Sequence, residues 1–397
     1  MKRLIKEFTA GNAMLSVLAV VASFIVGGIL IAVSSEDVQT TLGYVTARPS
    51  DFFNALWNAV FGAYDAMFRG AIFNYKATSF TLMIKPITET LAYATPITMA
   101  GLGLAVAFRS GLFNIGATGQ IIFGAMFAGW VGIFVELPFY LHFPLSVLAG
   151  IVGGGLFGAV VGLLKATTGA NEVIVTIMLN YIAAMLLSFF LKTPLLQAPG
   201  SINPISPPVR DTSKYWFFLG DQFRVHGGLI AMLLAVVFTW WLLNRSTLGF
   251  RFRALGHNPS AAKVAGINIG LTYVLVMGIS GALAGLAGTS QVLGSEKFLT
   301  LGVAASFGFD AITVALLGRS NPWGVLVAGL LFGGLRAGAV TMQANQGVPI
   351  DIVLVVQSLI VLFIAAPPLV RAMFRIKESK KEAAKSSRVR APQSRSW

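Results

Sequence analysis

Long apolar runs separated by short polar segments dominate the sequence, and most are close to the about 20 residues that a helix needs to cross a bilayer. They predict ten membrane-spanning helices, at residues 13–33, 87–108, 118–137, 145–165, 173–191, 228–243, 271–291, 302–318, 323–343 and 351–370. The first run is longer than the apolar region of a signal peptide, so it is interpreted as an uncleaved span. The pattern predicts an all-α, polytopic membrane protein.

Two polar segments are expected on the outer side, at 34–86 and 192–227. Within the first, aromatic and apolar residues recur at helical spacing over 50–73, which predicts an amphipathic helix lying on the outer surface. An extra span is the alternative, although two aspartates disfavour it. The second segment contains five prolines, which exclude regular structure over much of its length. We expect it to form a rigid rim for an external partner.

The segment 244–270 is a basic island between two apolar runs, with no acidic residue. Cytoplasmic loops of membrane proteins carry the excess of Lys and Arg, so the island is expected in the cytoplasm, together with both ends of the chain. Its second half predicts a short helix, because Asn258 can cap it, Pro259 suits its first turn and Gly266 can end it. A short helix with a small-residue face would suit docking of another protein.

Four motifs carry a resemblance to a known family. They are RALGHNPSAAKVAGI at 253–267, FRSGLFNIGATGQ at 108–120, NEVIVTIMLNYIA at 171–183 and GFDAITVALLGRSNPWG at 308–324. Together they resemble the permeases of ABC importers for branched-chain amino acids, simple sugars and nucleosides, and most of all the nucleoside type. The resemblance covers about 88–367.

The resemblance implies an inner-membrane permease that imports a small neutral solute, nucleosides first and simple sugars as the alternative. Its partners would be a cytoplasmic ATPase that binds the ATP, a second permease of the same or different sequence, and an external substrate-binding lipoprotein. No cofactor is expected on this chain. The island 244–270 would be the coupling loop, and the residues implied in ATPase coupling are Gly256, His257, Asn258, Ala261, Ala262, Ala265 and Gly266.

Polar side chains within or beside the spans are candidates for the solute pathway, because such groups are costly in lipid. The candidates are Asn114, Thr118, Gln120, Asn180 and Gln291. The segment 114–120 predicts a broken helix or re-entrant turn, and an ordinary cytoplasmic turn is the alternative. Asn180 could bind a polar solute or bridge two helices.

Asp310 and Arg336 are two opposite charges expected inside the membrane. Each costs about 2.5–3.5 kcal/mol at the centre of a span. A tight turn near Ser320 would leave them about 7–8 Å apart in height in antiparallel helices, a gap that an arginine side chain could nearly close. They are predicted to form an ion pair, structural in the first interpretation and gating in the second.

The composition narrows the function further. Charged residues make up only 11% of 397, compared with about 25% in soluble domains. The net charge of +14 does not indicate nucleic-acid binding, because half of it lies in a basic cytoplasmic tail at 371–397, after a permease domain at 1–370. The tail is expected to anchor the topology or to dock a partner.

Enzyme chemistry is not indicated. The sequence has no P-loop, no cysteine and only three widely spaced histidines, so neither nucleotide hydrolysis nor a metal site is expected. An ion-coupled secondary transporter would be expected to carry intramembrane carboxylates and to work without a partner. A non-transporting scaffold would explain the glycines at 150, 154, 158 and 162, which allow close helix packing, but not the polar groups in the spans.

Overall fold

The computed structural model describes residues 12–220, 222–366, 369–370 and 373–374 and is helical over most of these ranges. Eight of the described helices are long and apolar enough to cross a membrane. They are α2 (Asn12–Ser34), α5 (Phe80–Arg109), α6 (Ala117–Phe134), α7 (Phe139–Thr168), α8 (Glu172–Leu191), α9 (Gly228–Arg245), α12 (Ile269–Ser290) and α14 (Pro322–Gln346). The all-α, polytopic fold class is confirmed.

Two predicted spans are shorter than expected. The run at 302–318 is helical only over α13 (Phe307–Leu317), and the last span is α15 (Ile350–Ala365). At 1.5 Å per residue, the 11 residues of α13 extend about 16 Å, roughly half of a bilayer core. The chain before α13 is held in a turn instead, because Ser206 in the outer segment donates its N–H to the carbonyl of Leu299 and Ala305 adopts a positive φ of 40°.

Helix α5 forms the centre of the fold and is the most buried of the eight long helices. It packs against α9, α12, α13 and α14, and small residues let these helices approach closely. Gly103 lies against the backbone of Ser280, and Gly333 lies against Thr90 and Ala94. The helix starts at Phe80, seven residues before the predicted span, so the outer segment expected over 34–86 is shorter than its sequence pattern indicated.

Helices α7 and α12 meet through their backbones. An added Cβ at Gly154 would overlap the carbonyl oxygen of Gly281 and lie 2.5 Å from Cα of Gly285. Gly158 and Gly162 face α12 in the same way one and two turns further along. Gly155 is different, since the nearest atom to its added Cβ would be 3.4 Å away. The predicted small-residue stripe is therefore a real helix contact, restricted to one face of α7.

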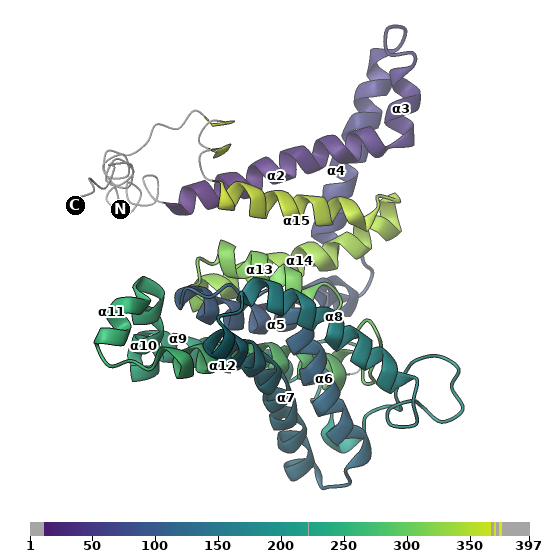
Figure 1. Cartoon of the computed structure of the whole chain (residues 1–397). Helices are drawn as coiled ribbons and strands as arrows, with labels where there is room; N and C mark the ends of the chain where they lie inside the picture. The colour runs from purple at the N-terminus through teal and green to yellow at the C-terminus, as the bar shows by residue number, and fades with distance from the viewer. Residues whose placement is uncertain (1–11, 221, 367–368, 371–372, 375–397) are drawn as a thin grey trace, which may run out of the picture.

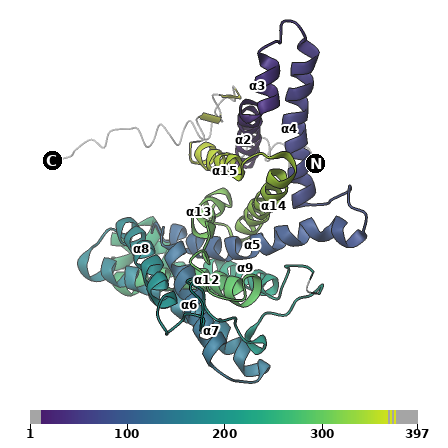
Figure 2. The same ribbon diagram turned by 90° about the vertical axis from the view of Figure 1, so that its right-hand side faces the viewer.

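The amphipathic helix expected over 50–73 is α4 (Pro49–Ala71), which follows the short α3 (Glu36–Leu42). It runs across the direction of α2 and α15 in both views (Figures 1 and 2) and is not among the helices apolar enough to span. Its aromatic side chains at Phe53, Trp57 and Phe61 are more than half exposed, while Tyr64 donates a hydrogen bond to the carbonyl of Phe24 in α2.

The two ends of the helix bundle carry different segments of the chain. One end carries α10 (Thr247–His257) and α11 (Pro259–Val264), at the left of Figure 1, where α2 also begins. The segment 192–227 lies at the opposite end. The basic residues around α10 and α11 assign their end to the cytoplasm. The basic tail at 371–397 falls outside the described residues, apart from 373–374.

Candidate functional site

The basic island folds into two short helices, and a side chain caps the start of each. Ser246 accepts the N–H of Gly249 at 2.9 Å at the start of α10, and Asn258 accepts the N–H of Ala261 at 3.0 Å at the start of α11. Gly266 then adopts a φ of 80°, a conformation that favours glycine. The local signals read from the sequence at Asn258, Pro259 and Gly266 thus fix both ends of the second helix.

The exposed surface of α11 differs from the surface expected from the sequence. Ala262 is only 3% exposed, so its side chain packs α11 onto the protein and does not belong to the expected docking face. Val264, which was not among the candidates, is 90% exposed. Ala261 and Ala265 remain exposed, as does His257. Val264 could have been identified from the sequence, because it is an apolar residue in a polar cytoplasmic segment.

The island contacts the turn at 110–116 through two glycines. An added Cβ at Gly256 would lie 2.5 Å from the carbonyl oxygen of Arg109, and Gly111 opposite has a φ of 73°. Arg109 donates from Nε to the carbonyl of Ser320 at 3.1 Å, in the turn between α13 and α14. The turn at 110–116 therefore connects α10 to the core helices.

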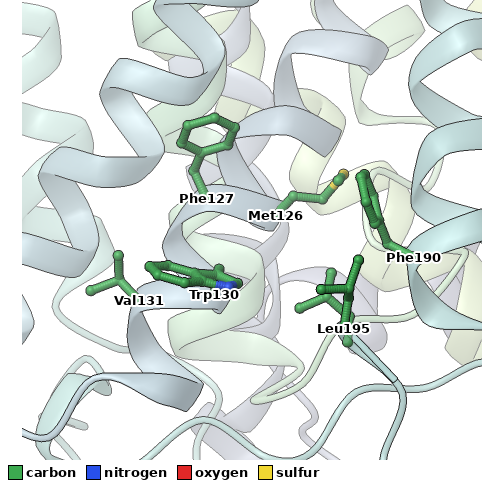
Figure 3. A pocket seen from close by; sticks show the side chains of 7 residues that line it. Met126, Phe127, Trp130, Val131, Phe190 and Leu195 are labelled. Carbon is green, nitrogen blue, oxygen red and sulfur yellow. The ribbon is translucent and has the colours of Figure 1, made fainter. Parts of the chain in front are cut away.

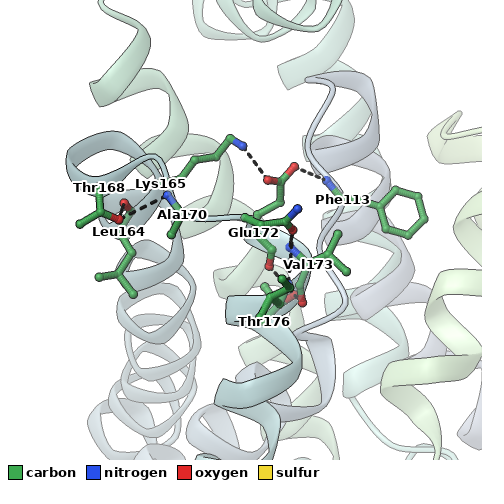
Figure 4. A network of polar contacts seen from close by, with 10 residues as sticks. Phe113, Leu164, Lys165, Thr168, Ala170, Glu172, Val173 and Thr176 are labelled. Atoms are coloured by element: carbon green, nitrogen blue, oxygen red, sulfur yellow. Dashed lines mark hydrogen bonds and ion pairs between the residues drawn. The ribbon is translucent and has the colours of Figure 1, made fainter.

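A second set of contacts holds the same turn to α7 and α8 (Figure 4). Lys165 in α7 pairs with Glu172 in α8 at 2.6 Å, and the other carboxylate oxygen of Glu172 accepts the N–H of Phe113 at 3.5 Å. Thr176 accepts the N–H of Ile115 at 3.3 Å. Backbone N–H groups of an irregular segment thus find side-chain partners.

Buried amides complete the anchoring. Asn114 is fully buried and donates to Gln120 at 3.1 Å and to Ser280 in α12 at 2.9 Å. Asn180 in α8 accepts the N–H of Gly119 at 2.8 Å and donates to the carbonyl of Ile115 at 2.9 Å. The structure therefore brings Asn114, Gln120 and Asn180 together around one non-helical segment.

The two remaining pathway candidates lie apart from this network. The hydroxyl of Thr118 is buried beside Gly308 and has no hydrogen-bond partner within the described residues. Gln291 is 4% exposed and begins the turn of π-helix (Gln291–Ser295) that extends α12. No hydrogen bond in the described part of the chain joins its side chain to the other four candidates.

Asp310 and Arg336 form an ion pair at 2.6 Å between α13 and α14. Ser306 donates to the same carboxylate oxygen at 2.9 Å and accepts a hydrogen bond from Arg336. The guanidinium also lies 5.0 Å from the centre of the Phe307 ring. Both side chains are mostly buried, so each charge depends on the other for its stabilisation.

Removing one charge of this pair is expected to be more damaging than removing both. Asp310→Asn should lower the free energy of unfolding by about 3–5 kcal/mol, because it leaves Arg336 buried without its counter-charge. The double variant Asp310→Asn with Arg336→Met should recover much of that loss. Thermal unfolding of the purified chain in detergent measures both. A single variant as stable as the wild type would contradict a structural role for the pair.

An apolar cavity of about 380 Å³ opens between α6, α8 and the start of the outer segment. Met126, Phe127 and Trp130 line one side, and Phe190 and Leu195 line the other (Figure 3). Trp130 supplies the only polar side-chain group in the lining. The cavity therefore suits an apolar chain and offers almost nothing to orient a polar solute.

No group of three or more His, Cys, Asp or Glu side chains that could hold a metal ion occurs within the described ranges. The chemistry that these residues offer consists of amides, hydroxyls and one buried ion pair. Such groups can stabilise and switch helix contacts or bind a neutral, hydrogen-bonding solute.

Comparisons with known proteins agree with the sequence motifs. Residues 87–365 match the family described as the permease component of branched-chain amino acid transport systems. The chain is 36% identical over 361 residues to the guanosine ABC transporter permease protein NupP of Bacillus subtilis, covering 91% of this chain and 95% of the relative. No solved structure matches the chain significantly.

Two other relatives cover most of the chain. The nucleoside ABC transporter permease protein NupB of Lactococcus lactis is 37% identical over 297 residues, which is 73% of this chain and 81% of the relative. The glucose ABC transporter permease protein TsgB13 of Haloferax volcanii is 33% identical over 286 residues, with 70% and 75% covered.

Proposed function

The chain belongs to the family of permease components of branched-chain amino acid transport systems, and from this premise we propose that it imports nucleosides. The observation that carries the proposal is the identity of 36% to a guanosine permease over 91% of the chain. A glucose permease is related at 33% over 70% of the chain, so a simple sugar is the second candidate. Energy comes from ATP hydrolysed by a separate subunit.

We propose that the exposed side of α11 docks this ATPase. Membership of the family implies an ATPase and a substrate-binding partner, and Val264, Ala261 and Ala265 offer a small apolar surface on the cytoplasmic side. Movement of this surface would pass to the turn at 110–116, because Gly256 and Gly111 pack backbone to backbone. A second permease subunit, of the same or a different sequence, would complete the path.

The pathway candidates have unequal access to a solute. Asn180 is partly exposed, whereas the hydroxyl of Thr118 and the side chains of Asn114, Gln120 and Gln291 are buried. We propose that Asn180 lies at the edge of the path. Asn114 and Gln120 would support the turn behind it, since their amides already bond to each other and Asn114 also bonds to Ser280.

Uptake measurements test the substrate class. Cells that express the chain with its ATPase and binding protein should take up labelled guanosine, and other unphosphorylated nucleosides in about ten-fold excess should remove most of the signal. Nucleotides and leucine should compete little, because the candidate path offers amides and hydroxyls for a neutral solute and no unpaired cation for a phosphate. The readout is the initial rate of uptake.

Glucose provides the decisive comparison. If labelled glucose enters with ATP dependence and nucleosides do not compete, the nucleoside proposal is wrong and the simple-sugar alternative replaces it. A variant of the ATPase that cannot hydrolyse ATP serves as the control for background entry. The family assignment does not depend on this outcome.

A further inference from the structure

A polar cavity of about 590 Å³ lies at the outer end of α4, α5 and α14. Its basic lining residues are Arg69 in α4, Lys76 in the following loop, Lys85 in α5, and Arg224 in the outer segment 192–227. Glu89 and Tyr93 in α5 also line it. The cavity is distinct from the coupling surface and from the amide network at 110–120, both of which lie towards the opposite end of α5.

The carboxylates near the cavity leave a surplus of positive charge. Asp65 binds Arg69 at 2.9 Å and Lys76 at 3.3 Å, and hydrogen bonds from Tyr75 and then from these two cations lower its pKa. Glu89 pairs with Arg224 at 3.4 Å. Four cations therefore share these two carboxylates, with Glu296 attracting Arg224 from beyond ion-pair distance.

Lys85 is the cation without a counter-charge. Its side chain forms no hydrogen bond or ion pair with any residue in the described ranges and is exposed, while its backbone carbonyl accepts a hydrogen bond from Thr88. Arg224 has a second partner, because its guanidinium lies 5.3 Å from the centre of the Tyr93 ring. The same guanidinium donates to Glu89 and to the Tyr93 hydroxyl, each at 3.4 Å.

This surplus lies on the side of the membrane where basic residues are disfavoured. The orientation rule places excess Lys and Arg in the cytoplasm, and the basic island fulfils that role at the other end of the molecule. Topology therefore does not account for four cations in one outer cavity. An anionic ligand does, because it would supply the missing negative charge.

The surroundings of the cavity are apolar and face outward. Three large apolar side chains beside the cavity are exposed: Ile72, Phe73 and Leu82. Leu82 also lines the cavity itself. A soluble anion would gain nothing from these side chains, whereas an amphiphile would place its charged group among the cations and its chains against the apolar surface.

We propose that this cavity binds the phosphate head group of an anionic phospholipid in the outer leaflet of the membrane. Lys85 and Lys76 meet the phosphate, and the acyl chains extend along Leu82 and the neighbouring Ile72 and Phe73. The bound lipid fixes α4 and the start of α5 to the outer surface. The proposal goes beyond the transport function and does not depend on which solute is carried.

Native mass spectrometry of the purified full-length chain tests the site. Dioleoylphosphatidylglycerol should bind as one tightly held copy, and dioleoylphosphatidylcholine should bind more weakly. The double variant Lys76→Gln with Lys85→Gln should weaken phosphatidylglycerol binding about 25-fold, at roughly five-fold for each basic residue near an anionic lipid. Replacement by arginine at both positions should preserve binding.

Lys192→Gln is the matched control, because Lys192 is also exposed on the outer side and has no ion pair in the described chain. It should leave lipid binding unchanged. Equal binding of the two lipids, or equal loss in the control, would overturn the proposal. Displacement of the lipid by millimolar inorganic phosphate would also overturn it and assign the cavity to a free anion. The proposal would also be overturned if the double variant kept its lipid binding but no longer captured the binding protein. That result would assign the surface to a protein partner.

Discussion

Val264→Asp is expected to reduce ATP-dependent uptake at least ten-fold while the protein still inserts into the membrane. Val264 is 90% exposed at the end of α11 and lies outside every span. In the proposed complex its side chain enters the ATPase, where a carboxylate would be buried without a partner. Uptake rate and ATP hydrolysis stimulated by the binding protein should fall together, and both are measured in proteoliposomes containing the complete transporter.

Val264→Ala is the control for this experiment, because it shortens the side chain and keeps it apolar. It should retain most of the uptake. The amount of ATPase that co-purifies separates the effects, since Val264→Asp should lower it and Val264→Ala should not. Normal uptake by Val264→Asp would show that the exposed side of α11 is not the docking surface.

Gly154→Ala and Gly155→Ala are expected to change stability in opposite directions, although they are neighbours in α7. The methyl group at Gly154 would enter the backbone of α12 at Gly281 and Gly285. Separating the helices to accommodate it should cost about 1–3 kcal/mol. At Gly155 the methyl group has room, with its nearest neighbour 3.4 Å away, and alanine favours a helix by up to about 1 kcal/mol over glycine.

The measurement is the midpoint of thermal unfolding. It is determined by size-exclusion chromatography of protein samples heated in detergent. Gly154→Leu should enlarge the loss to the point where little monodisperse protein is recovered. Equal midpoints for Gly154→Ala and Gly155→Ala would mean that α7 and α12 do not meet through their backbones.

The sequence was sufficient to predict most of the helices, because each lipid-length apolar run is visible as a continuous stretch within a short window. It was also sufficient for α4, where aromatic residues recur at helical spacing. It failed at 302–318, where the composition is apolar but the helix covers only Phe307–Leu317. The shortening depends on hydrogen bonds to the segment around Ser206, almost a hundred residues away, which no local pattern reports.

In the candidate site, too, features set by neighbouring residues were predictable and features set by distant contacts were not. Capping at Asn258 was predictable because cap and helix are neighbours, but the burial of Ala262 depends on how α11 packs onto the protein. Residue type was enough to single out Asn114 and Asn180. Their partners were not predictable, since Asn114 reaches Ser280 across 166 positions of sequence. Polar residues in apolar runs therefore identify positions that need a hydrogen-bond partner, and only the fold shows which residue that partner is.

The transverse orientation of α4 affects the two leaflets of the membrane unequally. A surface helix inserts its apolar face roughly 5–10 Å into one leaflet, and the exposed aromatic rings of Phe53, Trp57 and Phe61 provide such a face. With α4 on the outer surface, as its sequence pattern predicts, we expect the protein to displace more lipid area on its outer side than on its inner side. Such a wedge shape would couple the position of α4 to lateral pressure in the outer leaflet, so membrane curvature and lipid packing would act mechanically on the same helix that packs against α2 and α14.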